Sequence, residues 1–154
     1  MNNSNPIYLT KEGLENLKIE LQQLIDVERS EVAKRIKSAR DMGDTSENAE
    51  YSAARERQSF VEGRISELQD IIKNAVVENS TDLSKISVGH KVTLHIEGDH
   101  EEFHIVGATE ADPSLKKISY ESALGASLLG KKVGDEIEVE VPVGKLTYRI
   151  VDIK

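Results

Sequence analysis

The chain has 154 residues, a formal net charge of −8, no cysteine and no tryptophan. This length allows one ordinary domain or two small ones, and the absence of cysteine excludes disulfides and thiolate metal sites. The acidic balance argues against broad, non-specific binding of duplex nucleic acid, although it leaves room for a local basic patch. No stretch approaches the ~18 apolar residues of a membrane span, and the N-terminus lacks the features of a signal peptide. We therefore expect a cytoplasmic protein with no membrane partner.

A long helix is predicted after a short N-terminal arm. Residues 1–9 are expected to be frayed, and Thr10 is a good N-cap for a helix that carries Glu12 in its first turn. Apolar residues then follow at heptad-like spacing: Leu14, Leu17, Leu21 and Leu24, continued less regularly by Val32, Ile36 and Ala39. This pattern is typical of a helix packed against one partner. A helix of thirty residues spans about 45 Å, which is too long for the interior of a small globule.

A second long helix is predicted to begin near residues 44–47. One face of it carries six apolar residues: Ala54, Val61, Ile65, Leu68, Ile72 and Ala75. Gly63 lies within this helix, where glycine costs about 1 kcal/mol relative to alanine, so it is predicted to permit close packing. Two such helices joined by a short turn should form an antiparallel hairpin over residues 10–74, with the turn inside residues 40–47. We expect a monomer, because the partner helix already covers the apolar seam.

The hydrophobic period changes after a polar linker at residues 79–84. The pattern then predicts a series of strands and one short helix: strands at 88–96, 101–106, 117–120, 136–141 and 146–153, and the helix at 123–129. We therefore predict an α+β protein, with an antiparallel coiled-coil hairpin in residues 1–79 and a small antiparallel sheet domain with one short helix in residues 80–154. Four histidines of this half do not share one face of a strand and are expected at the surface: His90, His95, His100 and His104.

The turn of the hairpin concentrates negative charge, with Asp41, Asp44, Glu47 and Glu50 inside ten residues. Asp44 and Glu47 allow two interpretations. They can form a capping box, in which Asp44 accepts from the helix and Glu47 reaches back. They can also form part of a Mg²⁺ shell, since that ion often takes one or two protein carboxylates together with water and phosphate oxygens. The hairpin alone supplies too few ligands for tight binding, so such a site would be completed by another molecule.

Basic residues lie on both sides of this turn. Arg40 and Arg55 are nearest to it on opposite helices and are the best candidates for contacting a nucleic-acid phosphate. The remaining basic residues are expected to be ordinary surface charges interleaved with glutamate: Lys34, Arg35, Lys37, Arg57 and Arg64.

Several motifs, in this order, resemble the bacterial transcript-cleavage factors of the Gre family, and within it the GreA type. The resemblance covers nearly the whole chain. In the first half it is carried by Tyr8–Leu14, by the tip signature Ala39–Tyr51 and by Phe60–Ile65. In the second half it is carried by Ile105–Gly107, Glu110–Pro113, Leu124-Gly125 and Leu128–Asp135.

The resemblance implies a function in transcription. In that family the hairpin enters the secondary channel of RNA polymerase, and the second domain, which resembles the FKBP fold, docks near the channel mouth. Carried onto this sequence, Asp44 and Glu47 would help to hold the second catalytic Mg²⁺, shared with the polymerase, and position the water that cuts backtracked RNA. Arg40 and Arg55 would meet the extruded RNA 3′ end. Asn48 and Tyr51 would support the tip or contact the RNA. The protein would then not be an enzyme by itself.

Two other functions stay open. One is an inhibitor that plugs the channel without promoting cleavage, and the other is a stress or chaperone-like coiled coil whose tip is only a cap. The intact pair Asp44 and Glu47 favours cleavage over inhibition, and the second domain favours either over the chaperone. The short helix departs from the family, with Ala123 where proline is common and Ala126 where a basic residue is common. These two positions bear on how the second domain docks.

Overall fold

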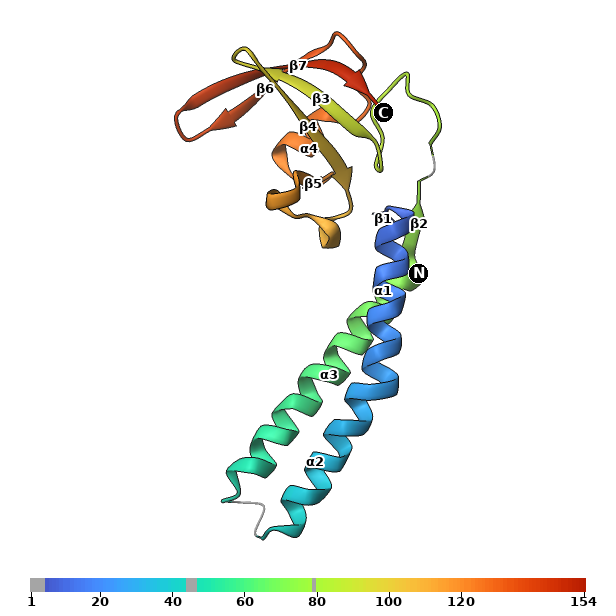
Figure 1. Ribbon diagram of the computed structural model, residues 1–154, viewed down its shortest axis with the longest axis vertical. Helices are drawn as coiled ribbons and strands as arrows, with labels where there is room; N and C mark the ends of the chain where they lie inside the picture. Colours follow the sequence, from blue (N-terminus) through green and yellow to red (C-terminus); the bar gives the residue numbers. More distant parts are fainter. Residues whose placement is uncertain (1–4, 44–46, 79) are drawn as a thin grey trace. The chain divides into compact units, whose positions relative to one another are not determined.

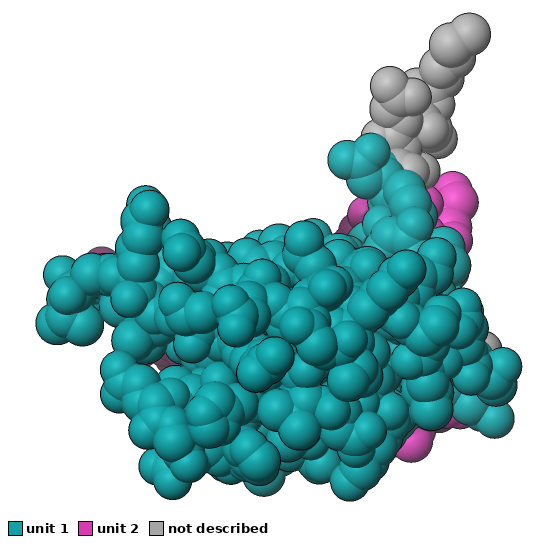
Figure 2. All heavy atoms as spheres, turned by 90° about the horizontal axis from the view of Figure 1, so that it is seen from above, with its two compact units in different colours: residues 1–14, 75–154 teal, residues 15–74 magenta. Residues whose placement is uncertain are grey.

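A computed structural model describes residues 5–43, 47–78 and 80–154. The contacts of the chain divide it into two compact units (Figure 2). One consists of Glu15–Asn74, and the other joins Ala75–Lys154 to the start of the chain as far as Leu14. The start of the chain, as far as Leu14, therefore packs with the second half of the chain.

The predicted antiparallel helical hairpin is confirmed, and Glu15–Asn74 makes up most of it. Its first arm consists of α1 (Lys11–Gln23), a π-helical segment (Leu24–Glu28) and α2 (Arg29–Asp41), and its second arm is α3 (Ala49–Asn74) (Figure 1). The seam between the arms is built from buried apolar side chains: Leu17, Leu24, Val32, Ile36 and Ala39 on the first arm, and Ala54, Val61, Ile65 and Leu68 on the second. No helix in the described ranges is long and apolar enough to cross a membrane.

The π-helical segment explains the irregular spacing in the first arm. The buried positions Leu17 and Leu24 are one heptad apart, whereas Leu24 and Val32 are one residue further apart than a heptad. In a regular helix this extra residue would turn Val32 away from the seam by about 100°. A π-helical turn takes up one additional residue, so the apolar face stays directed at α3 on both sides of the segment.

Deletion of Val27 should therefore be tolerated. This side chain is 45% exposed within the π-helical segment, and its removal restores heptad spacing between Leu24 and Val32, so that an ordinary α-helix keeps the seam. We expect a melting temperature close to that of the unmodified chain and unchanged helical circular dichroism.

Deletion of Gly63 is the matched control, since α3 has no such segment to take up the change. It would turn Val61 away from the face shared by Ile65 and Leu68. The loss of buried apolar surface would lower the free energy of unfolding by at least about 2 kcal/mol. Equal losses from the two deletions would contradict this explanation of the π-helical segment.

Ion pairs join the two arms along the exposed sides of the seam. Arg64 binds Glu20 through two hydrogen bonds of 2.7 and 3.1 Å and Glu67 through one of 2.9 Å. These bonds raise the pKa of Arg64 above its usual range. Arg29 and Glu62 form a second two-point pair, at 2.8 and 2.9 Å. The third pair, Arg57 to Glu28, is 3.0 Å long. Because all these side chains are partly exposed, each pair contributes at most about 1 kcal/mol.

This arrangement confirms that Arg57 and Arg64 are surface charges interleaved with glutamate. The predicted role of Gly63 is wrong, because a Cβ at this position would meet nothing within 4 Å. Close packing therefore does not explain the glycine.

The second half of the chain forms the predicted sheet domain. Its elements are β3 (Lys91–Ile96), β4 (Asp99–Val106), β5 (Lys117–Ser119), α4 (Ala123–Leu128), β6 (Glu136–Val141) and β7 (Gly144–Ile153). The strand order is β5-β4-β3-β7-β6. One face of the sheet packs with α4 around a core that includes Val92, Leu94, Ile105, Leu128 and Ile150.

The sheet differs from the prediction in one pairing. β5 runs parallel to β4, so the sheet is mixed and not wholly antiparallel. A parallel neighbour needs a connection that returns the chain to the starting edge. Here residues 107–116 make that return through two short 3₁₀ turns, Ala108–Glu110 and Pro113–Leu115.

The segment at residues 7–9 is not frayed, contrary to the prediction. Ile7–Leu9 forms β1, which pairs in parallel with β2 (Ala75–Val77) directly after α3. Leu9 is fully buried. Ala75 thus belongs to a strand and not to the apolar face of the second helix. Two three-residue strands carry too little periodicity to be found from sequence, and they are stabilised by pairing across a long separation.

The expectation that the four histidines lie at the surface is wrong for His90, which is buried. Its Nδ1 accepts a hydrogen bond of 3.1 Å from the Ser87 amide, so Nε2 carries the proton and donates to the Ser80 carbonyl at 2.9 Å. His104 is partly buried, and burial lowers its pKa. Within the described ranges no three histidine, cysteine or acidic side chains cluster as metal ligands would.

Candidate functional site: the hairpin tip

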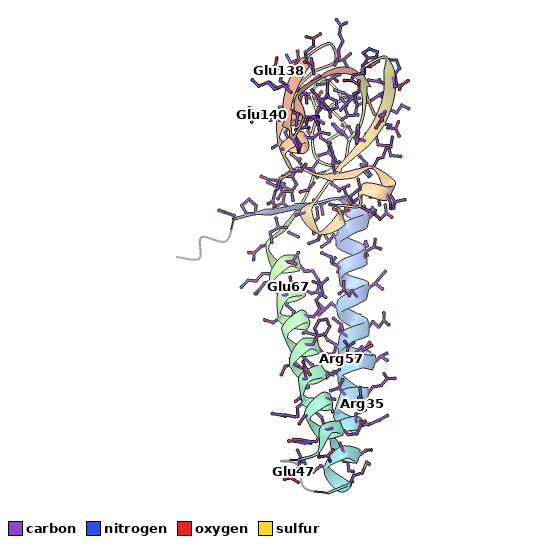
Figure 3. The ribbon with its side chains drawn as sticks, turned by 90° about the vertical axis from the view of Figure 1, so that its left-hand side faces the viewer. Arg35, Glu47, Arg57, Glu67, Glu138 and Glu140 are labelled. Atoms are coloured by element: carbon purple, nitrogen blue, oxygen red, sulfur yellow. The ribbon has the colours of Figure 1, made fainter. Side chains whose placement is uncertain are left out.

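The tip begins where α2 ends. Met42 and Gly43 continue the last turn through hydrogen bonds to the carbonyls of Ala39 and Arg40, at 3.3 and 3.4 Å. Gly43 then takes a φ of +143°, which residues other than glycine rarely adopt. The structure resumes at Glu47, whose exposed side chain lies at the end of the hairpin (Figure 3). Asp44, the other carboxylate singled out in the sequence, lies outside the described residues.

Asn48 joins the two helix ends at the tip. Its Oδ1 accepts a hydrogen bond of 3.1 Å from the amide of Tyr51, which makes it the N-cap of α3. Its Nδ2 donates a hydrogen bond of 2.6 Å to the carbonyl of Ala39 in the last turn of α2. The half-buried side-chain amide of Asn48 thus pairs with a backbone N–H of α3 and with a backbone carbonyl of α2. It thereby sets the spacing between the end of α2 and the start of α3.

The position of this cap corrects the predicted helix start. α3 begins at Ala49, with its N-cap at Asn48 and its third residue at Tyr51. Glu47 precedes the cap and therefore cannot be the third helical residue of a capping box. The sequence favoured residues 44–47 because the spacing of Asp44 and Glu47 fits a capping box, whereas Asn48 has no glutamate three residues later. Asparagine is nevertheless as strong an N-cap as aspartate.

Two of the candidate basic residues flank this cap. Arg40 lies over the ring of Tyr51, with 6.0 Å between the guanidinium carbon and the ring centroid. This cation–π contact links α2 to the first turn of α3. Arg55, one turn further along α3, donates a hydrogen bond of 2.9 Å to Gln58. Both arginines are exposed, so the structure brings basic groups from both helices close to the acidic tip.

A small hollow beside the tip was not found from the sequence. It has a volume of about 210 Å³ and is lined by Lys34, Arg35, Ser38, Ala39, Met42 and Glu50. Met42 is 75% exposed there. A methionine next to a turn glycine is the one signal that the sequence offered, since a large apolar side chain in a polar turn is unusual.

The donors at the tip suit a hard cation. Glu47 is exposed and offers carboxylate oxygens, which Mg²⁺ prefers over nitrogen or sulfur ligands. No histidine occurs near the tip, and the chain has no cysteine. This donor chemistry fits Mg²⁺ better than zinc or copper.

Comparison with protein families assigns both halves of the chain. Residues 7–77 match the N-terminal domain described as "Transcription elongation factor, N-terminal", and residues 80–154 match "Transcription elongation factor, GreA/GreB, C-term". The chain belongs to the GreA/GreB family of transcription elongation factors. The resemblance seen in the sequence motifs is thereby confirmed, and the tip described above is the tip of a GreA/GreB-family hairpin.

Curated members of the GreA/GreB family match along their whole length. Transcription elongation factor GreA of Thermoanaerobacter pseudethanolicus is 48% identical over 98% of this chain and 99% of its own. That of Acetivibrio thermocellus is 47% identical over 100% of this chain and 99% of its own. Among solved structures, GreA factor homolog 1 (Gfh1) of Thermus thermophilus is 29% identical over 97% of this chain and 99% of its own, with a TM-score of 0.46. The assignment to the family rests on the sequence matches.

Proposed function

We propose that this chain stimulates the cleavage of backtracked RNA by RNA polymerase. Its hairpin would enter the secondary channel and carry the tip to the polymerase active centre. The observation that supports this most directly is the position of Glu47, which is exposed at the tip and precedes the helix cap. Asn48 already caps α3, so helix capping does not account for the Glu47 carboxylate, which can serve as a ligand.

Asp44 and Glu47 would together hold one side of a Mg²⁺ ion that the polymerase shares. The bound metal pair would activate a water molecule and stabilise the leaving oxygen in phosphodiester hydrolysis. The chain would contribute negative charge, oxygen ligands and their placement, while the polymerase would supply the RNA-binding site and the other ligands of the metal. The protein would for this reason be a cofactor of the polymerase and not an enzyme.

The basic groups on either side of the tip would meet the RNA. Arg40 and Arg55 come from opposite helices and are exposed, so they can contact the phosphates of an extruded 3′ end. Tyr51 holds Arg40 through its ring, and Asn48 holds the two helix ends together. These contacts join Arg40 to the first turn of α3 and link the two helix ends next to Glu47.

The proposal is tested with purified bacterial RNA polymerase halted in a backtracked complex that carries RNA labelled at its 3′ end. Adding the protein with Mg²⁺ should release short 3′ fragments and allow elongation to resume. Without polymerase the protein should leave RNA intact and bind Mg²⁺ only weakly in calorimetry, because two carboxylates leave most of an octahedral shell to water. Inhibition of elongation without fragments would instead identify a channel-blocking inhibitor, and RNA hydrolysis without polymerase would identify a nuclease.

A further inference from the structure

Two segments far from the tip contact each other in the unit that contains the sheet. One runs from β1 into the first turn of α1 and includes Thr10 and Gly13. The other follows β4 and includes Gly107 and Glu110. Thr10 is the N-cap of α1: its Oγ1 accepts a hydrogen bond of 3.0 Å from the Gly13 amide, and its carbonyl accepts one of 3.0 Å from Leu14. This is the ordinary geometry of a threonine cap.

The carboxylate of Glu110 completes this cap from a distant part of the chain. Its Oε2 accepts a hydrogen bond of 3.0 Å from the backbone amide of Thr10, and its Oε1 accepts one from the Thr10 hydroxyl. Oε2 also accepts the amide of Gly107 at 3.1 Å, which ties the carboxylate to its own 3₁₀ turn. The side chain therefore joins the start of α1 to the chain that leaves the sheet after β4.

These contacts reproduce a capping box with one member moved. In the usual motif the third helical residue is a glutamate, and its carboxylate accepts the amide of the N-cap residue. Here that position is Gly13, which has no side chain, and the carboxylate comes from Glu110, 100 residues after Thr10. The helix start thus depends on a residue that only the folded sheet domain brings into place.

The space around this contact explains two glycines. A Cβ on Gly13 would collide with the Glu110 carboxyl group, and a Cβ on Gly107 would come within 2.5 Å of the Tyr8 carbonyl oxygen. Glycine is among the least favourable residues in a helix, and Gly13 lies in the first turn of α1 without any positive φ to require it. Its place there follows from the need to admit Glu110.

We propose that Glu110 is a positioning residue that anchors the helix leading to the tip. Glu110 supplies the carboxylate that the third helical residue usually gives to a capping box. It thereby makes the first turn of α1 part of the sheet domain's fold. A sheet domain that docks on a partner then holds the start of α1 at a fixed point. This functional consequence rests on the cleavage activity proposed above, whereas the cap itself does not.

The cap is tested by thermal melts of the full chain with a cycle of substitutions. Gly13→Ala should lower the melting temperature in the unmodified chain, because the new methyl group displaces Glu110. In a Glu110→Ala background the same substitution should raise it by about 3 °C, since only the helical preference for alanine remains. Gly63→Ala is the control, because Gly63 has open space around it, and it should raise the melting temperature in both backgrounds. An effect of Gly13→Ala with the same sign in both backgrounds would overturn the proposal.

The positioning role is tested in backtracked polymerase complexes. Glu110→Ala and Thr10→Val should lower the maximal cleavage rate at saturating protein about tenfold, since small misplacements of reacting groups carry penalties of this size. Thr10→Ser keeps the hydroxyl and should retain the rate. An unchanged maximal rate for Glu110→Ala would remove the positioning role. If the unmodified chain stimulates no cleavage, the proposed function fails, while the melting cycle still decides whether Glu110 completes the cap.

Discussion

Glu47→Gln is expected to abolish most of the stimulated RNA cleavage while leaving the melting temperature unchanged. The carboxylate lies outside the helix, before the Asn48 cap, so its replacement leaves that cap in place. A neutral amide is a much weaker Mg²⁺ ligand and cannot offset the charge of the metal. If the ligand supplies several kcal/mol of stabilisation in the transition state, its loss slows cleavage by at least about 100-fold.

The measurement is the rate of 3′ fragment release from backtracked complexes over a range of Mg²⁺ concentrations, beside a thermal melt and a competition assay for polymerase. Glu50→Gln is the matched control. It replaces another exposed glutamate at the tip, which lies in the first turn of α3, and we expect it to change cleavage little. Near-normal cleavage by Glu47→Gln would remove the metal-binding role and favour the inhibitor.

Asp44→Asn should have an effect on cleavage similar to that of Glu47→Gln. If Asp44 and Glu47 hold one metal ion together, the double variant should cleave little more slowly than the worse single variant, because the effects of groups that act as a unit are not additive. Additive losses would show that the two carboxylates act separately.

Much of the fold followed from the period of the apolar residues. The hairpin seam and the strands β3, β4, β6 and β7 have regular patterns several residues long, so local sequence is enough to predict them. The features that were missed are decided by distant partners. β1 and β2 are three residues each and exist because they pair with each other. β5 runs parallel to β4 because of the path of residues 107–116, which no local pattern encodes.

The tip shows the same limit on a smaller scale. Its residues were identified by resemblance, but the helix start was assigned to residues 44–47 because a capping box is the stronger local signal. The structure places the cap at Asn48, whose side chain has a second partner, the Ala39 carbonyl of the other helix. A contact between two helices decides the cap, and the sequence around the cap does not contain that information.

Asn48 should accordingly also be needed for full cleavage, through a different mechanism and with a smaller effect than the carboxylates. Asn48→Ala removes both the cap of α3 and the hydrogen bond to α2, at a combined cost of about 2 kcal/mol. Asn48→Asp separates these two effects. It keeps an oxygen to accept the Tyr51 amide, and its charge suits the N-terminus of a helix. Its second oxygen, however, would face the Ala39 carbonyl, where Nδ2 now donates at 2.6 Å, and the two oxygens repel each other.

We expect amide hydrogen exchange at Tyr51 and Ser52 to become faster in Asn48→Ala and to stay slow in Asn48→Asp, since only the first variant loses the cap. Cleavage should fall about 10-fold to 100-fold in both variants, because each one loosens the spacing of the helix ends that carry the reacting groups. Asn74→Ala is the control: it removes another asparagine of α3, whose Nδ2 donates to the Asp70 carbonyl at 2.9 Å far from the tip, and it should leave cleavage unchanged. Full cleavage by Asn48→Asp would show that the cap alone supports the tip and that the link to α2 does not matter.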